Sequence, residues 1–333
     1  MISASRYEHL DGASTPVAID AVADAIDAET GLVWIDCEEP DPAELATLMA
    51  QLQINEFAQE DVAKAGQRTK LAHYSDHFHV AVYDCVLHDT GMRAREIDIV
   101  FGAGWLLSVR QDPEDGDPGT FPVAHVRRTF ELQRSQHDEA HVGLLLWALL
   151  DTVVDRYFTV TEQVDERLDD VEEAVLADDT DRGGERAMRP MELFALGKAL
   201  VRFRRAAVPL RDVVNEIVRR EVPCIDDVAI VHFQDVADHV LRVADFVESQ
   251  RDVLTSLRDA ELALASNRMS LVQQRIAAWG AIFLVATLVT GVLGMNFQDA
   301  PELTWRQGFL IIVGVIFVLC APMYVFFRRR KWL

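Results

Sequence analysis

The longest apolar stretches of the chain lie near its C-terminal end. Residues 276–293 form a run of 18 without a charged side chain, and residues 308–327 form a second run of 20. A helix needs about 20 apolar residues to cross the hydrocarbon layer of a membrane, and a core helix of a soluble protein normally keeps a polar face. The pattern therefore predicts two transmembrane helices joined by a short external loop at 294–307.

Basic residues flank this pair of helices on one side of the membrane. Arg268 and Arg275 precede the first helix and the basic tail at 328–333 follows the second, whereas the loop carries only Arg306. Positive charge collects on the cytoplasmic side of membrane proteins. We therefore expect a multi-pass protein of the cytoplasmic (inner) membrane with both termini in the cytoplasm. The tail is interpreted as an anchor to anionic lipid.

The first 136 residues alternate between two kinds of pattern. Short β-branched and aromatic stretches bounded by Gly, Asp and Pro predict strands at 32–36, 78–87, 96–101 and 104–110. Helical periodicity predicts helices near 41–52, 56–64 and 121–136. Together these elements predict a cytoplasmic α/β domain over residues 1–136.

From residue 140 onward the pattern is helical and rich in charge. The breaks DDTDRGG and VPCID divide it into helices at 140–178, 185–221 and 226–293. We expect a helical hairpin at 137–225 and a stalk at 226–275, which continues as the first transmembrane helix at 276–293. At 1.5 Å per residue, this last helix is about 100 Å long. The fold class is α+β, and so long a rod predicts association with other chains.

One face of the long helix carries small or polar residues where a coiled coil carries bulky apolar ones. These residues recur every three or four positions: Asp259, Ala263, Ser266, Ser270, Gln273, Ala277, Gly280, Leu284, Thr287 and Gly291. Small residues suit close packing of membrane helices, and polar ones suit a ring of helices around water. The pattern alone leaves both interpretations, a packing face and a pore lining, equally open.

The charge of the chain argues against one class of partner. Its 333 residues include 32 Lys and Arg against 54 Asp and Glu, a formal net charge of −22. So acidic a chain repels phosphate-rich nucleic acid, and nucleic-acid binding is not expected. Its four scattered cysteines form no C-x-x-C pair, which argues against a disulfide framework or a zinc ribbon. No nucleophile-and-base arrangement is evident in the sequence, so we expect no enzymatic activity.

Histidines and carboxylates elsewhere in the chain favour structural roles. His73, His77 and His79 in HYSDHFH invite a zinc interpretation, but His73 precedes the predicted strand and no further ligand is evident, so a half-buried strand surface is favoured. The carboxylates at 162–181 are typical of a solvated helix face. His239 is expected to pair locally with neighbouring carboxylates.

The loop between the two apolar helices begins with a distinctive motif. G-M-N at 294–296 stands at the exit of the first helix, P-E-L at 301–303 follows in the loop, and K-W-L at 331–333 ends the sequence. In this order the motifs resemble those of the CorA family of magnesium and cobalt channels. Further matches are QEDVAKAGQRTKL at 59–71, EIDIVFG at 96–102, HFQDVADH at 232–239 and SNRMS at 266–270. The resemblance covers nearly the whole chain.

This resemblance implies a homopentamer with a cytoplasmic funnel, in which the long helix of each copy lines a pore for Mg²⁺, with Co²⁺ as a second ion. The lipid bilayer and the other copies are the implied partners. The implied selectivity ring is Gly294, Met295 and Asn296, with a ring at the cytoplasmic mouth on Asp259 and a polar ring within the span on Thr287. The implied regulatory residues, which bind cytoplasmic Mg²⁺ between copies, are Glu60, Asp61, Asp165 and Asp235. Asp61 and the Asp235 of a neighbouring copy are expected to repel each other unless a cation bridges them.

The residue types of the implied filter suit Mg²⁺. This ion prefers oxygen ligands in octahedral geometry and loses its water reluctantly, so the side-chain amide of Asn296 can hold the hydrated ion. A ring of neutral oxygens also binds weakly enough for the ion to leave. Asp299 and Glu302 in the loop are expected to concentrate cations at the entrance, with an effect that salt screens beyond about 8 Å.

Four residues depart from the family pattern. Leu293 replaces an aromatic residue before G-M-N, Ala300 replaces a Met in the loop, Ser270 replaces an Asn at the inner mouth, and Leu284 replaces a Met within the span. The first two bear on loop packing and the last two on the width and polarity of the pore. The intact G-M-N favours magnesium over the related ZntB zinc transporters, whose filter usually has Val in place of Met. A ZntB-like proton-coupled Zn²⁺ transporter is the alternative function.

Overall fold

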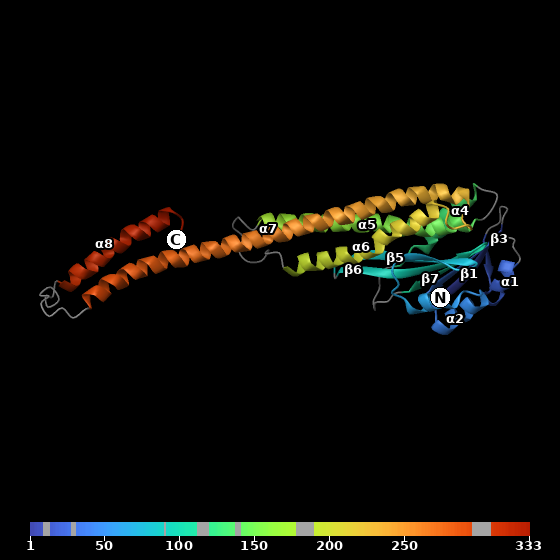
Figure 1. Ribbon diagram of the computed structural model, residues 1–333, viewed down its shortest axis with the longest axis horizontal. Helices are drawn as coiled ribbons and strands as arrows, with labels where there is room; N and C mark the ends of the chain where they lie inside the picture. The colour runs from blue at the N-terminus through green and yellow to red at the C-terminus, as the bar shows by residue number, and fades with distance from the viewer. Residues whose placement is uncertain are drawn as a thin grey trace. The chain divides into compact units, whose positions relative to one another are not determined.

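The computed structural model describes residues 1–8, 14–27, 31–89, 91–111, 120–136, 141–177, 190–294 and 308–333. They divide into two compact units, an N-terminal unit at Met1–Ser256 and a C-terminal unit at Leu257–Leu333. The N-terminal unit holds a mixed sheet with helices on both faces, and the C-terminal unit holds two long helices (Figure 1). The helix α7 (Asp227–Leu293) contributes to both units.

The described part of the N-terminal unit contains a seven-stranded sheet in the order β2-β1-β3-β7-β6-β5-β4. Its strands are β1 (Ile2–Glu8), β2 (Thr15–Val17), β3 (Gly31–Glu38), β4 (Lys70–His73), β5 (His77–His88), β6 (Gly91–Gly102) and β7 (Trp105–Gln111). Neighbouring strands are antiparallel, except that β3 and β7 are parallel. The four strands predicted from the sequence are confirmed as β3, β5, β6 and β7.

The sequence pattern does not predict β1, β2 or β4. Small and charged residues interrupt the apolar residues of β1, and β2 and β4 are only three and four residues long. Pairing with longer neighbours therefore stabilises these strands more than their own composition does. β4 contains His73, which the sequence pattern places outside any strand.

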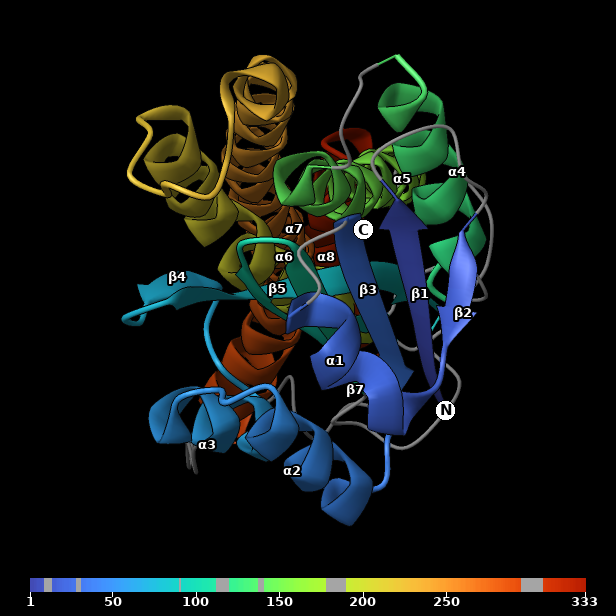
Figure 2. The same ribbon diagram turned by 90° about the vertical axis from the view of Figure 1, so that its right-hand side faces the viewer.

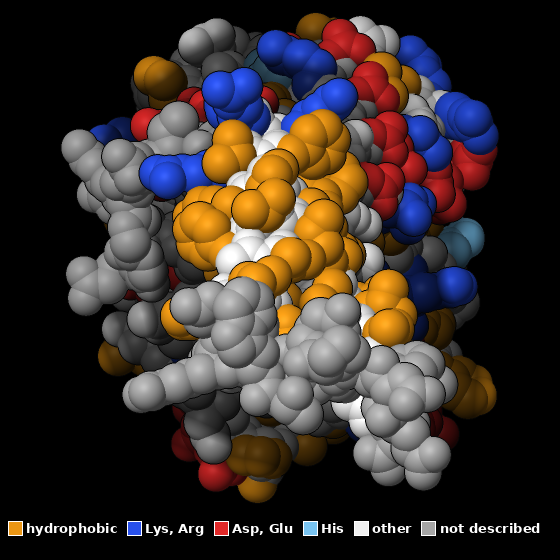
Figure 3. Space-filling view, turned by 90° about the vertical axis from the view of Figure 1, so that its left-hand side faces the viewer, with side chains coloured by type: hydrophobic (Ala, Val, Ile, Leu, Met, Phe, Trp, Pro, Cys, Tyr) orange, Lys and Arg blue, Asp and Glu red, His pale blue; other side chains and the backbone are white. Residues whose placement is uncertain are grey.

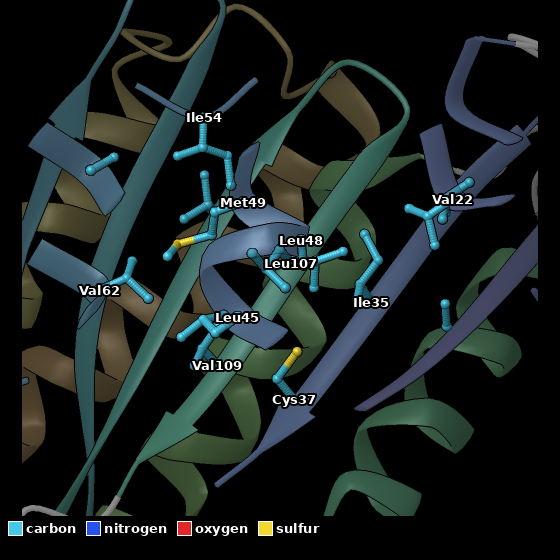
Figure 4. Close-up of a cluster of buried hydrophobic side chains, with 14 residues drawn as sticks. Val22, Ile35, Cys37, Leu45, Leu48, Met49, Ile54, Val62, Leu107 and Val109 are labelled. Atoms are coloured by element: carbon cyan, nitrogen blue, oxygen red, sulfur yellow. The ribbon is translucent and has the colours of Figure 1, made fainter. Parts of the chain in front are cut away.

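Three short helices cover one face of the sheet (Figure 2): α1 (Val22–Asp27), α2 (Pro42–Gln51) and α3 (Glu56–Lys64). The side chains of Asp41 and Asn55 cap α2 and α3 by accepting hydrogen bonds, each at 2.9 Å, from the backbone N–H groups of Ala43 and Phe57. Apolar residues of α2 pack on alternate residues of β3 and β7. Figure 4 shows this buried cluster, with Leu45, Leu48 and Met49 near Ile35, Cys37, Leu107 and Val109.

Three longer helices cover the opposite face: α4 (Val123–Arg134), α5 (Val142–Ala177) and α6 (Pro190–Val218). The hydroxyl of Tyr157 on α5 donates to the carbonyl of Tyr83 on β5 at 2.6 Å. Arg156 pairs with the buried carboxylate of Asp84. The predicted helices are confirmed as α2 to α6, although the ends predicted at 140, 178 and 185 lie outside the described residues.

α7 is one continuous helix of 67 residues and confirms the rod predicted at 226–293. Within the N-terminal unit it packs on α5 through two ring contacts. Trp147 lies 4.5 Å from His232, and Phe158 lies 5.5 Å from His239, measured between ring centroids. The first half of α7 is therefore part of the packed helical layer.

The C-terminal unit contains the second half of α7 and the helix α8 (Gly308–Arg329). The two helices pack around Ala278 and Ile282 of α7, which are buried, and the Sγ atom of Cys320 on α8 contacts the carbonyl of Ile282. Both helices are long and apolar enough to cross a membrane. Figure 3, viewed from the end of the molecule where α7 ends and α8 begins, shows hydrophobic side chains gathered on the surface. The exposed apolar residues of α8 include Phe317 and Val318.

Replacing Gly143 with Ala is expected to destabilise the protein. A Cβ atom at this position of α5 would lie 2.7 Å from the Cβ atom of Ala229, so α5 and α7 must move apart at a cost of about 1–3 kcal/mol. Gly197→Ala on α6 is the matched control, because its Cβ atom would meet the flexible end of Leu254 at 3.1 Å. Thermal unfolding of the detergent-solubilised protein should give a lower melting temperature for Gly143→Ala than for Gly197→Ala. Equal melting temperatures would contradict this close approach.

Candidate metal sites and pore surface

Asp61 and Glu60 lie side by side on α3. The Asp61 side chain is about a quarter exposed, and its Oδ2 atom lies 2.6 Å from the Nζ atom of Lys70 on β4. Glu60 is more exposed and pairs with Lys64 one turn further along the helix. Each of these carboxylates therefore has a basic partner within its own chain.

A second acidic group lies between α5 and α7. Asp151 and Asp155 are one turn apart on α5, His239 faces them from α7, and one ligand atom from each lies within 4.8 Å of the other two. Among the described residues, Nδ1 of His239 has no hydrogen-bond partner, and Nε2 lies 3.7 Å from Oδ1 of Asp235. Carboxylate oxygens with an imidazole nitrogen form a ligand set for a divalent cation. This is the one such group in the described part of the chain.

The electrostatics of this group favour a bound positive charge. Burial raises the pKa of the Asp151 carboxyl to about 6, and the negative charges of Asp155 and Asp235 act in the same direction. The folded chain therefore binds this proton more tightly than the unfolded chain, and the cation-free protein gains stability as the pH falls through about 6. At higher pH a cation can take the place of the proton.

Asp165 lies outside this group. It is exposed on α5, and its Oδ1 atom accepts a hydrogen bond from the side-chain amide of Gln250 on α7 at 2.7 Å. Gln250 follows Asp235 by 15 residues, which is about 22 Å along the helix. The structure thus brings Asp235 to Asp151 and Asp155 rather than to Asp165.

Asp61 and Asp235 lie on opposite sides of the sheet within one chain. Figure 2 shows α3 below one face, and α5 and α6 on the other face together with α7. No single copy can bind one cation through both carboxylates. A cation that bridges Asp61 and Asp235 therefore requires two copies of the chain.

The small and polar face of α7 is exposed throughout the C-terminal unit. The exposed residues include every one expected to line a pore: Asp259, Ser270, Gln273, Ala277, Gly280, Leu284, Thr287 and Gly291. At 3.6 residues per turn, this face lies on the side of α7 opposite the buried contacts with α8 at Ala278 and Ile282. The hydroxyls of Ser270 and Thr287 donate to carbonyls of their own helix at 3.0 and 2.8 Å, which leaves their oxygens as acceptors.

The G-M-N motif falls where α7 ends. Gly294 directly follows the last helical residue, is exposed, and donates its N–H to the carbonyl of Thr290 at 2.9 Å. Four further residues implied at the outer end of the pore lie outside the described residues: Met295, Asn296, Asp299 and Glu302.

A family described as "CorA-like Mg2+ transporter protein" matches residues 29–329, which is most of the chain. The chain belongs to this family. Membership makes the protein a CorA-family divalent metal transporter, and such transporters are not a class of enzymes. The exposed apolar surfaces of α7 and α8 fit a membrane protein of this family.

Individual relatives extend over most of this CorA-family chain. The cobalt/magnesium transport protein CorA of Thermotoga maritima is 29% identical over 285 residues, which cover 84% of this chain and 77% of the relative. The putative metal ion transporter YfjQ of Bacillus subtilis is 28% identical over 307 residues, which cover 90% and 89%.

Solved structures share the fold at lower identity. The CorA magnesium transporter from Methanocaldococcus jannaschii superposes with a TM-score of 0.80 at 20% identity, over 100% of this chain and 99% of that chain. The cytoplasmic domain of ZntB from Vibrio parahaemolyticus has a TM-score of 0.56 at 13% identity, over 80% and 99%. The CorA-like fold therefore includes the N-terminal α/β unit, the long helix and the two apolar helices.

The sequence pattern of this CorA-family chain contains a signal for Asp151 and Asp155 that the expected sites do not use. These two residues, and likewise Asp235 and His239, stand four positions apart on predicted helices, so each pair shares one helix face. The sequence pattern does not predict that α5 docks on α7, and this docking brings the two pairs together. The expected local pairing of His239 is confirmed by its contact with Asp235.

The histidines at 73–79 form no ligand group in the structure. His73 stacks on Phe78, and His79 is buried with its Nε2 atom 2.7 Å from Oδ1 of Asp98. The Nδ1 atom of His77 lies 2.7 Å from Oδ1 of Asp76. Each histidine thus has a different partner, as a structural role predicts.

Stabilisation by Mg²⁺ should depend on pH through Asp151. When the pH falls below about 6, the carboxyl is protonated and a cation must displace the proton, so binding weakens. The rise in melting temperature caused by Mg²⁺ should therefore be larger well above this pH than well below it. Asp151→Asn should reduce both the rise and its pH dependence, whereas Asp169→Asn, at an exposed position of the same helix, should change neither. An equal rise on both sides of pH 6 in the wild type would contradict cation binding here.

Proposed function

We propose that the protein is a homopentameric channel that carries Mg²⁺, with Co²⁺ as a second ion, into the cell. The observation that most supports this proposal is the exposed face of α7 from Asp259 to Gly291. This face has too few bulky residues for a coiled-coil dimer, and its polar members Asp259, Ser270 and Gln273 suit contact with water. A ring of copies around a water-filled axis would cover it, and the names of the relatives supply the class of ion.

The outer end of this axis would carry the selectivity filter. We assign it to Gly294, Met295 and Asn296, because they follow directly on the exposed face of α7. In this assignment, the side-chain amides of Asn296 hold Mg²⁺ through its water shell, since the ion gives up water reluctantly. The flanking charges favour cytoplasmic termini, which puts Asp299 and Glu302 in an external loop where they attract cations.

The cytoplasmic part would sense Mg²⁺ and close the channel. In the proposed assembly, one cation bridges Asp61 of one copy and Asp235 of the next, because these carboxylates repel each other when no cation lies between them. A cation that binds the closed state more tightly than the open state stabilises the closed state by that difference in binding free energy. Glu60 adds negative charge beside Asp61.

Asp235 also lies near a group of three possible ligands in its own chain. Asp151, Asp155 and His239 supply two carboxylates and an imidazole beside it. We therefore propose Asp151 and Asp155 as further regulatory ligands beside Asp61 and Asp235. Asp165, which the family resemblance also implies, accepts a hydrogen bond from Gln250 and stays a separate candidate.

Asn296→Ala should abolish selective Mg²⁺ influx while assembly survives. Each amide lost removes a hydrogen bond to the water shell of the ion, worth about 0.5–1.5 kcal/mol, so loss of the ring should reduce flux roughly tenfold or more. The measurement compares Mg²⁺, Co²⁺ and Zn²⁺ uptake into proteoliposomes, with the oligomer checked by cross-linking.

Asp299→Asn is the matched control in the same loop and should keep most of the flux, because the field of an exposed charge is screened. Unchanged Mg²⁺ uptake by Asn296→Ala would refute the filter assignment. Zn²⁺ uptake that requires a pH gradient, with no Mg²⁺ flux in the wild type, would instead support the proton-coupled Zn²⁺ transporter.

A further inference from the structure

Lys70 forms an ion pair with Asp61, the carboxylate at which the proposed function has a cation bind. Its Nζ atom lies 2.6 Å from Oδ2 of Asp61 and 3.4 Å from Oε1 of Gln67. The Lys70 and Asp61 side chains are each about a quarter exposed. A cation that approaches Asp61 therefore meets a carboxylate whose charge is already neutralised.

A second carboxylate lies in the same row of the sheet as Lys70. Lys70 pairs with Ala81 on β5, and Ala81 pairs with Asp98 on β6. Residues directly opposite each other on neighbouring strands point to the same face, so these three side chains share the face that α3 covers. The one between them is the small side chain of alanine.

The geometry allows the lysine to reach across this row. Neighbouring strands are about 4.8 Å apart, so Lys70 and Asp98 are separated by about 10 Å at their Cα atoms. The flexible four-carbon chain of lysine spans most of this gap, and Asp98 lies beyond Ala81 in the same row. Ala81 has no atoms beyond its Cβ to block the path.

Asp98 has one oxygen available for this contact. Its side chain is fully buried, and Oδ1 lies 2.7 Å from Nε2 of His79. Oδ2 is buried without a hydrogen-bond partner among the described residues. Burial is the main cause that raises the pKa of Asp98, and the charge of Lys70 opposes it. A nearby ammonium group would therefore stabilise the ionised carboxylate.

We propose that Lys70 is a built-in competitor for the Asp61 site, which moves from Asp61 to Asp98 when a divalent cation binds Asp61. This inference rests on the proposed regulation by cytoplasmic Mg²⁺ and adds the residue that sets its threshold. With Lys70 on Asp61, the cation must displace an ammonium group before it binds, so the affinity of the site is lowered. With Asp98 available, the displaced charge is not left unpaired in a partly buried place.

This movement of Lys70 predicts opposite effects for substitutions at Lys70 and at Asp98. Lys70→Met keeps the apolar stem and removes the competitor, so closure should need less Mg²⁺. Asp98→Asn keeps the shape and weakens the alternative partner, so Lys70 should stay on Asp61 and closure should need more Mg²⁺. In the double variant, the second substitution should have no further effect, because no lysine remains to move.

The test uses the full chain in proteoliposomes loaded with increasing internal Mg²⁺, and measures the concentration that halves Mg²⁺ influx. The partly exposed ion pair predicts a roughly two- to fivefold decrease for Lys70→Met and a similar increase for Asp98→Asn. The double variant should match Lys70→Met. Lys198→Met removes an exposed lysine of α6 and should leave the concentration unchanged. Lys70→Gln should repeat the direction of Lys70→Met.

Two results would overturn the proposed movement of Lys70 and leave the proposed regulation by Mg²⁺ intact. One is a half-closing concentration for Lys70→Met equal to or above that of Lys198→Met. The other is an Asp98→Asn effect that persists in the Lys70→Met background, which would indicate disturbance of His79 instead. Asp61→Asn tests the proposed regulation by Mg²⁺ itself. If this substitution does not change closure by internal Mg²⁺, both the proposed regulation and the movement of Lys70 are overturned.

Discussion

A helix face that one copy of the chain cannot cover is the constraint on which the rest of the structure depends. α8 packs on only one side of α7, at Ala278 and Ile282, and the opposite side stays exposed over most of the apolar segment. Bulky residues there would have favoured pairing in a coiled coil, and a fully apolar face would have favoured lipid. The small and polar residues that stand there suit either close helix packing or a ring of helices around water, and the channel that we propose is the second of these.

The same helix carries the residues that we propose to regulate this ring. Asp235 and His239 stand in the first half of α7 and the exposed face stands in the second half, so the backbone of one helix links them. The cytoplasmic carboxylates are not all alike. Asp84 is buried and paired with Arg156, which suits a structural role. Asp151 and Asp155 lie together with one imidazole, and this shortage of positive charge suits a cation.

Much of the fold could be predicted from the sequence because its signals are local. Apolar runs at 276–293 and 308–327 exceed the length of an ordinary strand and lack charges, and Gly and Pro mark the ends of the long helices. β2 and β4 could not be predicted, because three or four residues are too few to show a period, and their stability comes from neighbouring strands.

The candidate sites also differ in whether one sequence segment or only the folded chain brings their residues together. The G-M-N motif and the exposed face of α7 follow from the order of residues in one segment. The group of Asp151, Asp155 and His239 depends on the docking of two helices separated by 49 residues, which no local pattern encodes. The row from Lys70 to Asp98 likewise depends on strand register, which only the paired sheet defines.

The accessibility of the exposed face of α7 to a charged reagent during ion flux tests the central claim most directly. Thr287→Cys and Val318→Cys place one thiol on this face and one on the exposed apolar surface of α8. If α7 lines a water-filled axis, a cationic thiol reagent should block Mg²⁺ flux through Thr287→Cys and leave Val318→Cys unaffected. Flux through Thr287→Cys that the reagent does not change, together with block of Val318→Cys, would contradict the account.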